Sequence, residues 1–207
     1  MSPTTTIPAP AEARQMTAEA FCDFVHRPEN ADKWFELVRG EVIELPPPQK
    51  RHGRVSVNIA FVLETYVRQR RKGYVTSNDS GVILERDPDT VRGPDVAVYE
   101  DAQSWDELHP KYGEVPPVLA VEVLSPNDKV NKVNRKIADY LRSGVGLVWL
   151  ADPEERTVTV YRRGHEPRLH EPSEELTGED ILPGLTLKVA DCFLMPGEPA
   201  APPAAGA

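Results

Sequence analysis

Cysteine is scarce in this chain of 207 residues: the only two, Cys22 and Cys192, stand far apart and form no CxxC pair. A disulfide framework or a cysteine-rich structural zinc site is therefore not expected, and a reducing cytosol is the expected compartment. Long hydrophobic runs are missing too, since none approaches the ~18 residues needed to cross a bilayer. The first residues lack a basic start and an apolar stretch, so we expect neither a membrane span nor a secretory signal.

Positive charge is also in short supply. The formal net charge is −9 at pH 7, whereas a nucleic-acid-binding protein usually carries a basic footprint. Basic residues do cluster at 50–54, 68–72 and 129–136, so a local positive surface on an acidic body remains open. The alternative interpretation is that these clusters are merely solvated faces. Among catalytic signatures, G-x-S-x-G, the P-loop and the glycine-rich dinucleotide fingerprint are all absent.

The composition is that of one globular domain, with 40% hydrophobic residues to form its core. Residues 1–15 and 196–207 are rich in proline and alanine and bury little apolar surface, so we interpret both as flexible tails. The domain is thus expected to span residues 16–195. No internal repeat is apparent.

The pattern of apolar residues predicts an α/β (α+β) fold, with helices packed on a mixed β-sheet. A short helix is expected after Thr17, and a longer one over residues 54–72, with Gly73 as its left-handed C-terminal residue. Strand–helix–strand order over 118–150 predicts two parallel strands. The expected hairpins are Trp34–Val38 with Glu41–Leu45 and residues 74–84; the other expected elements are strands 95–99, 118–124, 147–150, 157–162 and 182–189 and helix 129–142.

Two carboxylates stand in apolar strands. Glu122 is the one charged residue in a run, residues 118–124, that is otherwise apolar and reads as a buried strand. Asp95 likewise precedes the apolar residues 96–98. A buried carboxylate needs a cation, a metal or a place at the edge of the sheet. Taken alone, Asp95 could also be turn chemistry, and Glu122 could belong to a buried ion pair.

A hard divalent cation provides one role for both carboxylates. Mg²⁺ takes one or two carboxylates and leaves room for phosphate oxygens. Lys136 is the candidate for a nearby positive charge, because it lies on the shoulder of the expected helix beside Tyr140. The apolar stripe that we expect to face the core of this helix consists of Val130, Val133, Ile137 and Leu141. Trp34 and Trp149 are also expected in the core.

Five separated motifs in this order resemble the Uma-two family of restriction-endonuclease-like proteins, which belongs to the PD-(D/E)XK nuclease superfamily. The resemblance covers roughly residues 16–195. The motifs are Phe35-Glu36-Leu37-Val38-Arg39-Gly40-Glu41-Val42 with Pro47-Pro48 and His52; Gly93-Pro94-Asp95-Val96; Val121-Glu122-Val123-Leu124-Ser125-Pro126; Lys136-x-x-x-Tyr140-x-x-x-Gly144-Val145, followed by Val148-Trp149-Leu150 and Asp152-Pro153; and Gly178-Glu179-Asp180 with Leu182-Pro183-Gly184-Leu185.

The resemblance implies a site with Mg²⁺ or Mn²⁺ as cofactor. Asp95 and Glu122 would be catalytic metal ligands, and Glu41 would be a further acidic ligand or, alternatively, a solvated strand residue. Leu124 occupies the place of the superfamily's E-x-K lysine, so the resemblance implies that Lys136 supplies this catalytic lysine from the following helix. His52 would contact substrate phosphate, unless it is only a helix-start histidine.

Tyr140 belongs to the expected substrate-binding set, with packing and a hydroxyl hydrogen bond as its expected contribution. These residues together predict a metal-dependent endonuclease that hydrolyses nucleic-acid phosphodiesters with an activated water. DNA is the expected partner, with RNA left open, and a homodimer would suit cleavage of two strands. Two alternatives stay open: a catalytically inactive nuclease-fold module that binds nucleic acid or protein, and a hydrolase of a small phosphoester.

Overall fold

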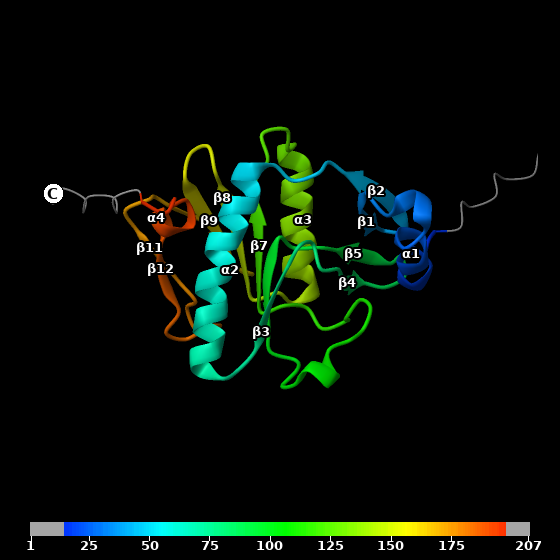
Figure 1. Cartoon of the computed structure of the whole chain (residues 1–207), viewed down its shortest axis with the longest axis horizontal. Coiled ribbons are helices and arrows are strands. Elements are labelled where there is room, and N and C mark those ends of the chain that lie inside the picture. The colour runs from blue at the N-terminus through cyan, green and yellow to red at the C-terminus, as the bar shows by residue number, and fades with distance from the viewer. Residues whose placement is uncertain (1–14, 198–207) are drawn as a thin grey trace, which may run out of the picture.

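The computed structural model describes residues 15–197, so nearly all of the two expected tails lies outside the described residues. Figure 1 shows the arrangement of the elements. The helices of the described part are α1 (Ala18–Val25), α2 (Lys50–Arg70), α3 (Val130–Ser143) and α4 (Val189–Cys192), with short 3₁₀ turns at Pro28–Asn30 and Trp105–Glu107. None of these helices is long and apolar enough to cross a membrane.

A six-stranded mixed sheet forms the centre of the molecule. Its strand order is β10-β9-β8-β7-β6-β3. Only β7 and β8 pair in parallel, as the strand–helix–strand pattern predicts, and the other neighbours are antiparallel. The strands are β3 (Tyr74–Ser77), β6 (Val96–Tyr99), β7 (Leu119–Val123), β8 (Leu147–Asp152), β9 (Thr157–Tyr161) and β10 (Arg168–His170). The expected mixed α/β architecture is therefore confirmed.

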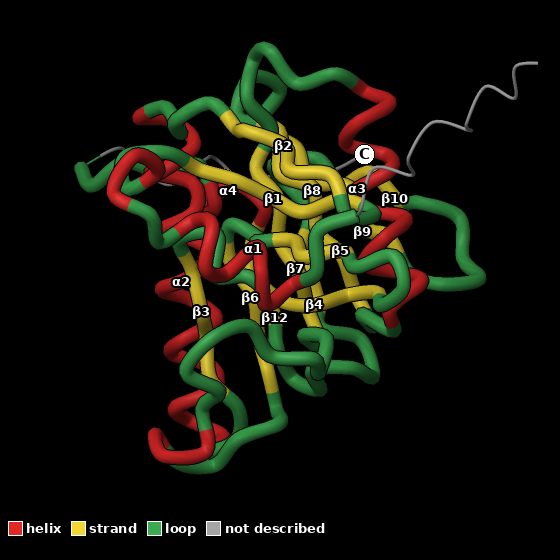
Figure 2. Tube along the Cα trace, turned by 90° about the vertical axis from the view of Figure 1, so that its right-hand side faces the viewer, coloured by secondary structure: helices red, strands yellow, loops and turns green. Residues whose placement is uncertain are grey.

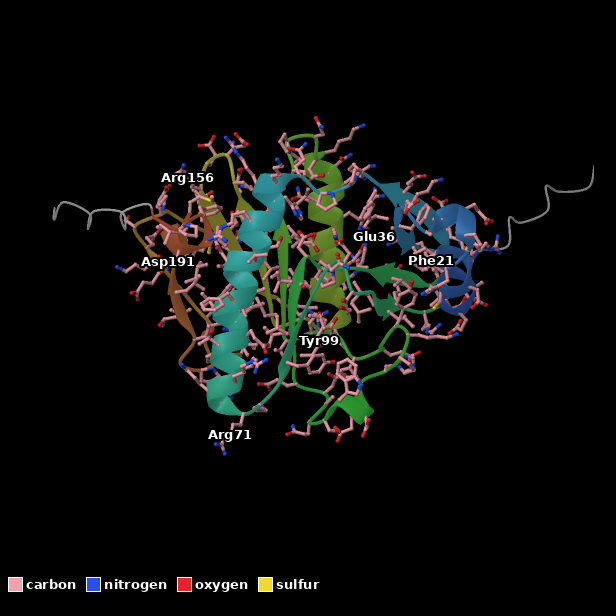
Figure 3. The ribbon with its side chains drawn as sticks, viewed as in Figure 1. Phe21, Glu36, Arg71, Tyr99, Arg156 and Asp191 are labelled. Atoms are coloured by element: carbon pink, nitrogen blue, oxygen red, sulfur yellow. The ribbon has the colours of Figure 1, made fainter. Side chains whose placement is uncertain are left out.

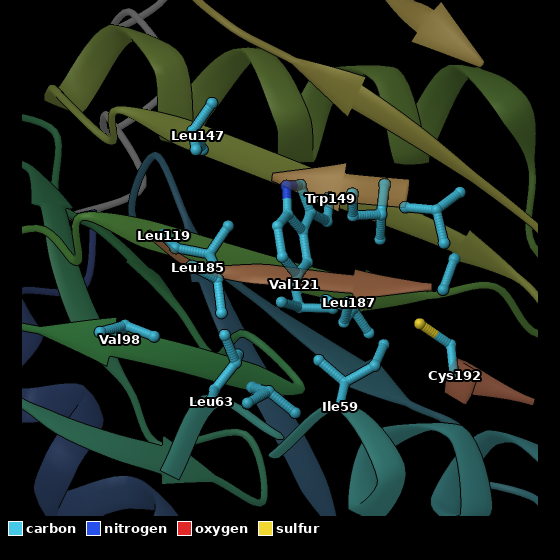
Figure 4. Close-up of a cluster of buried hydrophobic side chains, with 14 of the residues drawn as sticks. Ile59, Leu63, Val98, Leu119, Val121, Leu147, Trp149, Leu185, Leu187 and Cys192 are labelled. Atoms are coloured by element: carbon cyan, nitrogen blue, oxygen red, sulfur yellow. The ribbon is translucent and has the colours of Figure 1, made fainter. Parts of the chain in front are cut away.

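The two long helices cover opposite faces of this sheet. Leu119 and Val121 of β7 belong to the same buried cluster as Ile59 and Leu63 of α2. Ala120, between them on the strand, packs instead with residues of α3. Figure 4 shows the α2 side, where the C-terminal ribbon β11 (Glu175–Thr177) and β12 (Thr186–Lys188) closes the core together with α4. Alternation along β7 consequently turns Glu122 toward α3.

A second, four-stranded sheet lies beside the first, with the order β2-β1-β5-β4. It consists of β1 (Trp34–Val38), β2 (Glu41–Leu45), β4 (Val82–Glu85) and β5 (Thr90–Arg92). Helix α1 packs on one face of this sheet through Phe21, which joins a cluster with Leu37 and Val91. Figure 2 views the molecule from this end. The opposite face of β1 and β5 looks toward α3 and carries charged residues.

Three sequence predictions are corrected by the structure. Residues 74–84 do not form a hairpin, because β3 pairs with β6 in one sheet and β4 with β5 in the other. Helix α2 begins at Lys50, four residues before the expected start, so His52 lies in its first turn. The left-handed residue after α2 is Arg71, with φ 52°, although Gly73 also has a positive φ.

Helix α3 departs from the expected apolar stripe at its first residue. Val130 is 74% exposed, whereas Ile137 and Tyr140 are buried and Val133 and Leu141 are partly buried. The helix follows the turn after β7, and its first turn therefore projects beyond the end of the sheet. Gly144, with φ 107°, ends the helix as its left-handed cap, at the predicted place.

Candidate active site

The register of β6 and β7 explains why the two carboxylates predicted from sequence lie together. Val96 lies opposite Val121, and Ala97 lies opposite Ala120. One further step of this antiparallel register places Asp95, just before β6, beside Glu122. The backbone N–H of Val123 donates to Asp95 Oδ2 at 2.6 Å, which fixes this carboxylate at the end of the sheet. Both residues are at least 90% buried.

Lys136 projects from α3 into the same place. Its Nζ lies 2.7 Å from Glu122 Oε2 and 3.0 Å from Glu36 Oε1, and it donates to the carbonyl of Gly93 at 3.1 Å. An ammonium group has three N–H donors, so these three contacts satisfy it. Although burial opposes the charged form, Glu122 and Glu36 raise the pKa of Lys136 above its ordinary value. The lysine is therefore held as a cation.

Glu36 of β1 completes this ion network and had no assigned role in the sequence prediction. The register that pairs Leu37 with Val91 brings Glu36 beside Arg92 of β5, and Arg92 Nη1 lies 2.6 Å from Glu36 Oε2. Burial acts to raise the pKa of Glu36, but Lys136 and Arg92 together lower it below its ordinary value. Arg92 also donates to Asp139 of α3, through Nε at 3.1 Å and Nη2 at 2.5 Å. The second sheet is thus tied to α3 by buried charges.

Glu122 sits in a different electrostatic environment. Burial raises the pKa of Glu122 to about 8, the negative charges of Asp95 and Glu36 add to the rise, and Lys136 opposes it. Tyr140 donates its hydroxyl hydrogen bond to Glu122 Oε1 at 2.7 Å. Tyr140 is fully buried and does not line the pocket. The expected packing and hydroxyl hydrogen bond are seen, and they orient Glu122. A contact of Tyr140 with substrate stays a prediction.

His52 and Asp79 approach Asp95 from the other side. His52 Nε2 lies 3.2 Å from Asp95 Oδ2, and this contact raises the pKa of His52 even though burial opposes the rise. Burial, with the charge of Asp95, raises the pKa of Asp79 to about 6. Asp79 lies in the turn between β3 and β4 with a positive φ of 54°. A carboxylate-rich cluster thus gathers around Asp95.

These residues open into a pocket of about 260 Å³ between the second sheet, the end of the first sheet and α3. Glu41, the expected further acidic ligand, is exposed and lines this pocket from β2. Trp34 also lines it and is only half-buried, so the expectation that Trp34 belongs to the core is wrong. Trp149, in contrast, is fully buried as expected.

The donor chemistry fits a hard divalent cation of the Mg²⁺ type. Asp95 and Glu122 offer carboxylate oxygens at the bottom of an open pocket, and Mg²⁺ needs only one or two carboxylates because it keeps several waters. Across residues 15–197 no group of three or more histidine, cysteine, aspartate or glutamate residues has the arrangement of a complete metal cage. A site with few protein ligands is thus the kind of metal site that these residues could form.

The basic clusters do not form one surface. Figure 3 shows Arg71 at the far end of α2 from Glu36, so the cluster at 68–72 lies away from the site. In that cluster, Glu100 pairs with Arg70 and Lys72. The cluster at 129–136 does reach the pocket, which Lys132 and Arg135 line together with Lys136. The local positive charge at the site thus comes mainly from α3.

Two residues of this cluster escaped the sequence prediction for different reasons. Glu36 carried the same signal as Glu122, a charged residue inside an apolar strand, and could have been found by that rule. Asp79 carried no such signal, because polar residues are ordinary in turns. Its closeness to Asp95 follows from the route of the chain between two sheets, which no local pattern specifies.

The chain is similar to a solved structure described as a putative nuclease belonging to DUF820 from Anabaena variabilis. The TM-score is 0.72 at 25% sequence identity, and the match covers 86% of this chain and 97% of that chain. No curated protein matches the sequence significantly. The fold is accordingly that of a nuclease.

Residues 21–190 match the model of the family described as "Uma2: Putative restriction endonuclease". The match covers most of the chain, and the chain therefore belongs to the Uma2 family. The resemblance inferred from the five motifs is confirmed, and with it the assignment to a nuclease-type enzyme family with nucleic acid as the general class of substrate.

Proposed function

We propose that this protein is a divalent-metal-dependent endonuclease that hydrolyses phosphodiester bonds in nucleic acid, with DNA as the expected substrate. One observation carries the proposal: Asp95 just before β6, Glu122 of β7 and Lys136 of α3 line one open pocket. Membership of the Uma2 family supports the same reaction class. Cleavage of DNA and RNA circles in parallel would distinguish the two substrates.

Asp95 and Glu122 would hold Mg²⁺ or Mn²⁺. When bound, such a cation lowers the pKa of a coordinated water and neutralises charge on phosphoryl oxygens. The backbone N–H of Val123 orients Asp95, and the hydroxyl group of Tyr140 orients Glu122. Glu41 remains a proposed further ligand, at the edge of the pocket.

Lys136 would act as a fixed positive charge. Because its pKa is raised, it keeps its proton at neutral pH and is a poor general base. A cation held beside Glu122 can stabilise the negative charge that develops on the phosphoryl group. His52, hydrogen-bonded to Asp95, would hold that carboxylate in place and present its other edge to a substrate phosphate.

The alternative of an inactive nuclease-fold module is favoured by one specific feature. Both oxygens of Glu122 already have partners, Tyr140 and Lys136, so the network is complete without a metal. A protein of this kind would bind no Mg²⁺ or Mn²⁺ at Glu122. A metal-binding measurement therefore separates the two functions.

Calorimetric titration of Mn²⁺ tests the proposal, with the wild type compared with Glu122→Gln. The matched control is Glu64→Gln, because Glu64 is a surface residue of α2 paired with Arg68. We expect Mn²⁺ binding by the wild type and Glu64→Gln and none by Glu122→Gln. Absence of binding by all three proteins would contradict the metal-dependent function and favour the inactive module.

A further inference from the structure

The hairpin β1–β2 has two apolar faces, which is unusual for an antiparallel pair at the surface. Phe35, Leu37 and Val42 face the cluster around α1. The alternate residues face the pocket, and its apolar side chains there form what we call the hairpin wall: Trp34, Val38, Ile43 and Leu45. Antiparallel sheets normally place polar residues on their open face. All four residues of the hairpin wall are only partly buried, so this apolar surface is left open inside the pocket.

The first turns of α3 form the opposite, cationic side of the pocket. Lys132 and Arg135 are exposed there, and neither has an ion-pair partner within the described part of the chain. The carboxylates Asp95 and Glu122 lie between the two sides. One pocket therefore offers an apolar wall with an aromatic ring, two free cations, and the proposed catalytic carboxylates.

This combination matches a nucleotide whose base is unpaired. An unstacked base exposes an apolar π-face that can stack on an aromatic side chain, and its phosphate takes a cation. In a paired duplex the base faces are covered by their neighbours. Binding of a duplex depends instead on many phosphate contacts along a basic surface.

Several basic residues outside the pocket are already paired with acidic ones. Arg51 pairs with Glu154, Arg68 with Glu64, and Arg70 with Glu100. The net charge of −9 adds repulsion at longer range. Stacking therefore has to supply a large share of the affinity, and only an unpaired strand provides it.

We propose that the pocket binds an unpaired nucleotide, with its base on the hairpin wall at Trp34 and its phosphate toward Lys132 and Arg135. This inference rests on the proposed function and specifies its substrate class. The preferred substrate is single-stranded nucleic acid, or a strand that has opened locally, rather than intact duplex.

Fluorescence anisotropy with a labelled single-stranded DNA of mixed sequence, and with the same strand in a duplex, tests the inference. Ca²⁺, which shares the preference for oxygen ligands, replaces the catalytic metal so that binding is measured apart from cleavage. We expect the wild type to bind the single strand at least about tenfold more tightly than the duplex, since each stacked base contributes about 5- to 150-fold.

Trp34→Ala should lose about tenfold or more of the single-strand affinity, and Trp34→Phe should keep most of it. Trp105→Ala is the matched control, because Trp105 is 84% exposed and outside the pocket. Lys132→Gln with Arg135→Gln should weaken binding and reduce its salt dependence. A thermal melt of each variant identifies loss of fold. If Trp34→Ala unfolds, Trp34→Leu keeps the test decisive, because leucine retains an apolar side chain without an aromatic face and should lose the affinity that Trp34→Phe keeps.

The inference is overturned if the duplex is bound as tightly as the single strand, or if Trp34→Ala binds as well as Trp105→Ala. Cleavage is assayed separately with Mn²⁺ on circular single-stranded DNA. Tight, Trp34-dependent binding without cleavage would uphold this inference and contradict the proposed function. Cleavage by a protein that binds duplex more tightly, with an affinity that does not depend on Trp34, would support the proposed function and contradict this inference.

Discussion

Arg92 is the residue whose removal should affect folding most clearly. Its guanidinium is buried between two carboxylates, 2.6 Å from Glu36 and 2.5 Å from Asp139, and its side chain is 7% exposed. Arg92→Met leaves Lys136 as the remaining charged partner of Glu36 and the partly exposed Arg142 as that of Asp139. Breaking a buried ion pair by removing one partner destabilises a protein by about 3–5 kcal/mol.

For a domain of this size, that loss corresponds to a fall in Tm of about 6–20 °C. Urea unfolding and thermal melts of wild type and Arg92→Met would measure it. Arg68→Met is the control. The side chain of Arg68 is 78% exposed, and its ion pair with Glu64 should contribute about 0.5 kcal/mol or less. The double variant Arg92→Met with Asp139→Leu should recover part of the stability, because the buried Oδ2 of Asp139 is then no longer left without a donor.

This reasoning is refuted if the free energy of unfolding of Arg92→Met lies within about 1 kcal/mol of that of the Arg68→Met control. It would mean that the buried charges are hydrated or rearranged in solution. Arg92→Lys gives a graded check. One ammonium group cannot reproduce the several N–H donors of the planar guanidinium, so the stability of Arg92→Lys should fall between that of the wild type and that of Arg92→Met.

Two further predictions concern backbone packing and pH. A Cβ at Gly93 would lie 2.4 Å from the carbonyl oxygen of Asp79, so Gly93→Ala should destabilise the protein by about 1–3 kcal/mol. Gly53 is a helical position with open space around it, so Gly53→Ala should stabilise the protein by up to about 1 kcal/mol. Urea unfolding compares the two variants, and equal effects would contradict the packing argument. Burial, helped by Arg168, lowers the pKa of the buried His170, so the folded state binds its proton less readily than the unfolded state and stability should fall as pH drops through about 6.5. His170→Gln should flatten that part of the profile of stability against pH. An unchanged profile would contradict the claim that the lowered pKa of His170 causes the fall.

Local patterns predicted those parts of the fold that depend on neighbours in sequence. The hairpin of Trp34–Val38 with Glu41–Leu45 and the parallel pairing of β7 with β8 are confirmed, because alternation and chain order specify them. The hairpin expected over residues 74–84 is wrong, since β3 and β4 each find a distant partner. A strand's pattern shows which face it buries but not which strand it will join.

The candidate site was likewise predictable only where a local pattern marks its residues. Asp95 and Glu122 were found because a charge in an apolar strand requires an explanation, and the register then brought them together. The buried link through Glu36 and Arg92 needed the second sheet to be placed against α3, which the sequence does not reveal. The partial exposure of Trp34 in the pocket was missed because an alternating strand normally buries its large apolar residues.

The most direct test of the central claim is cleavage of circular single-stranded and supercoiled DNA by purified protein with Mn²⁺. Wild type is compared with Lys136→Met and with Lys188→Met, an exposed lysine of β12 that does not line the pocket. We expect Mn²⁺-dependent opening of a circle by the wild type and Lys188→Met and none by a folded Lys136→Met. Cleavage that persists in Lys136→Met, or a wild type that cleaves neither circle with Mn²⁺, would contradict the assignment of this site as a nuclease centre.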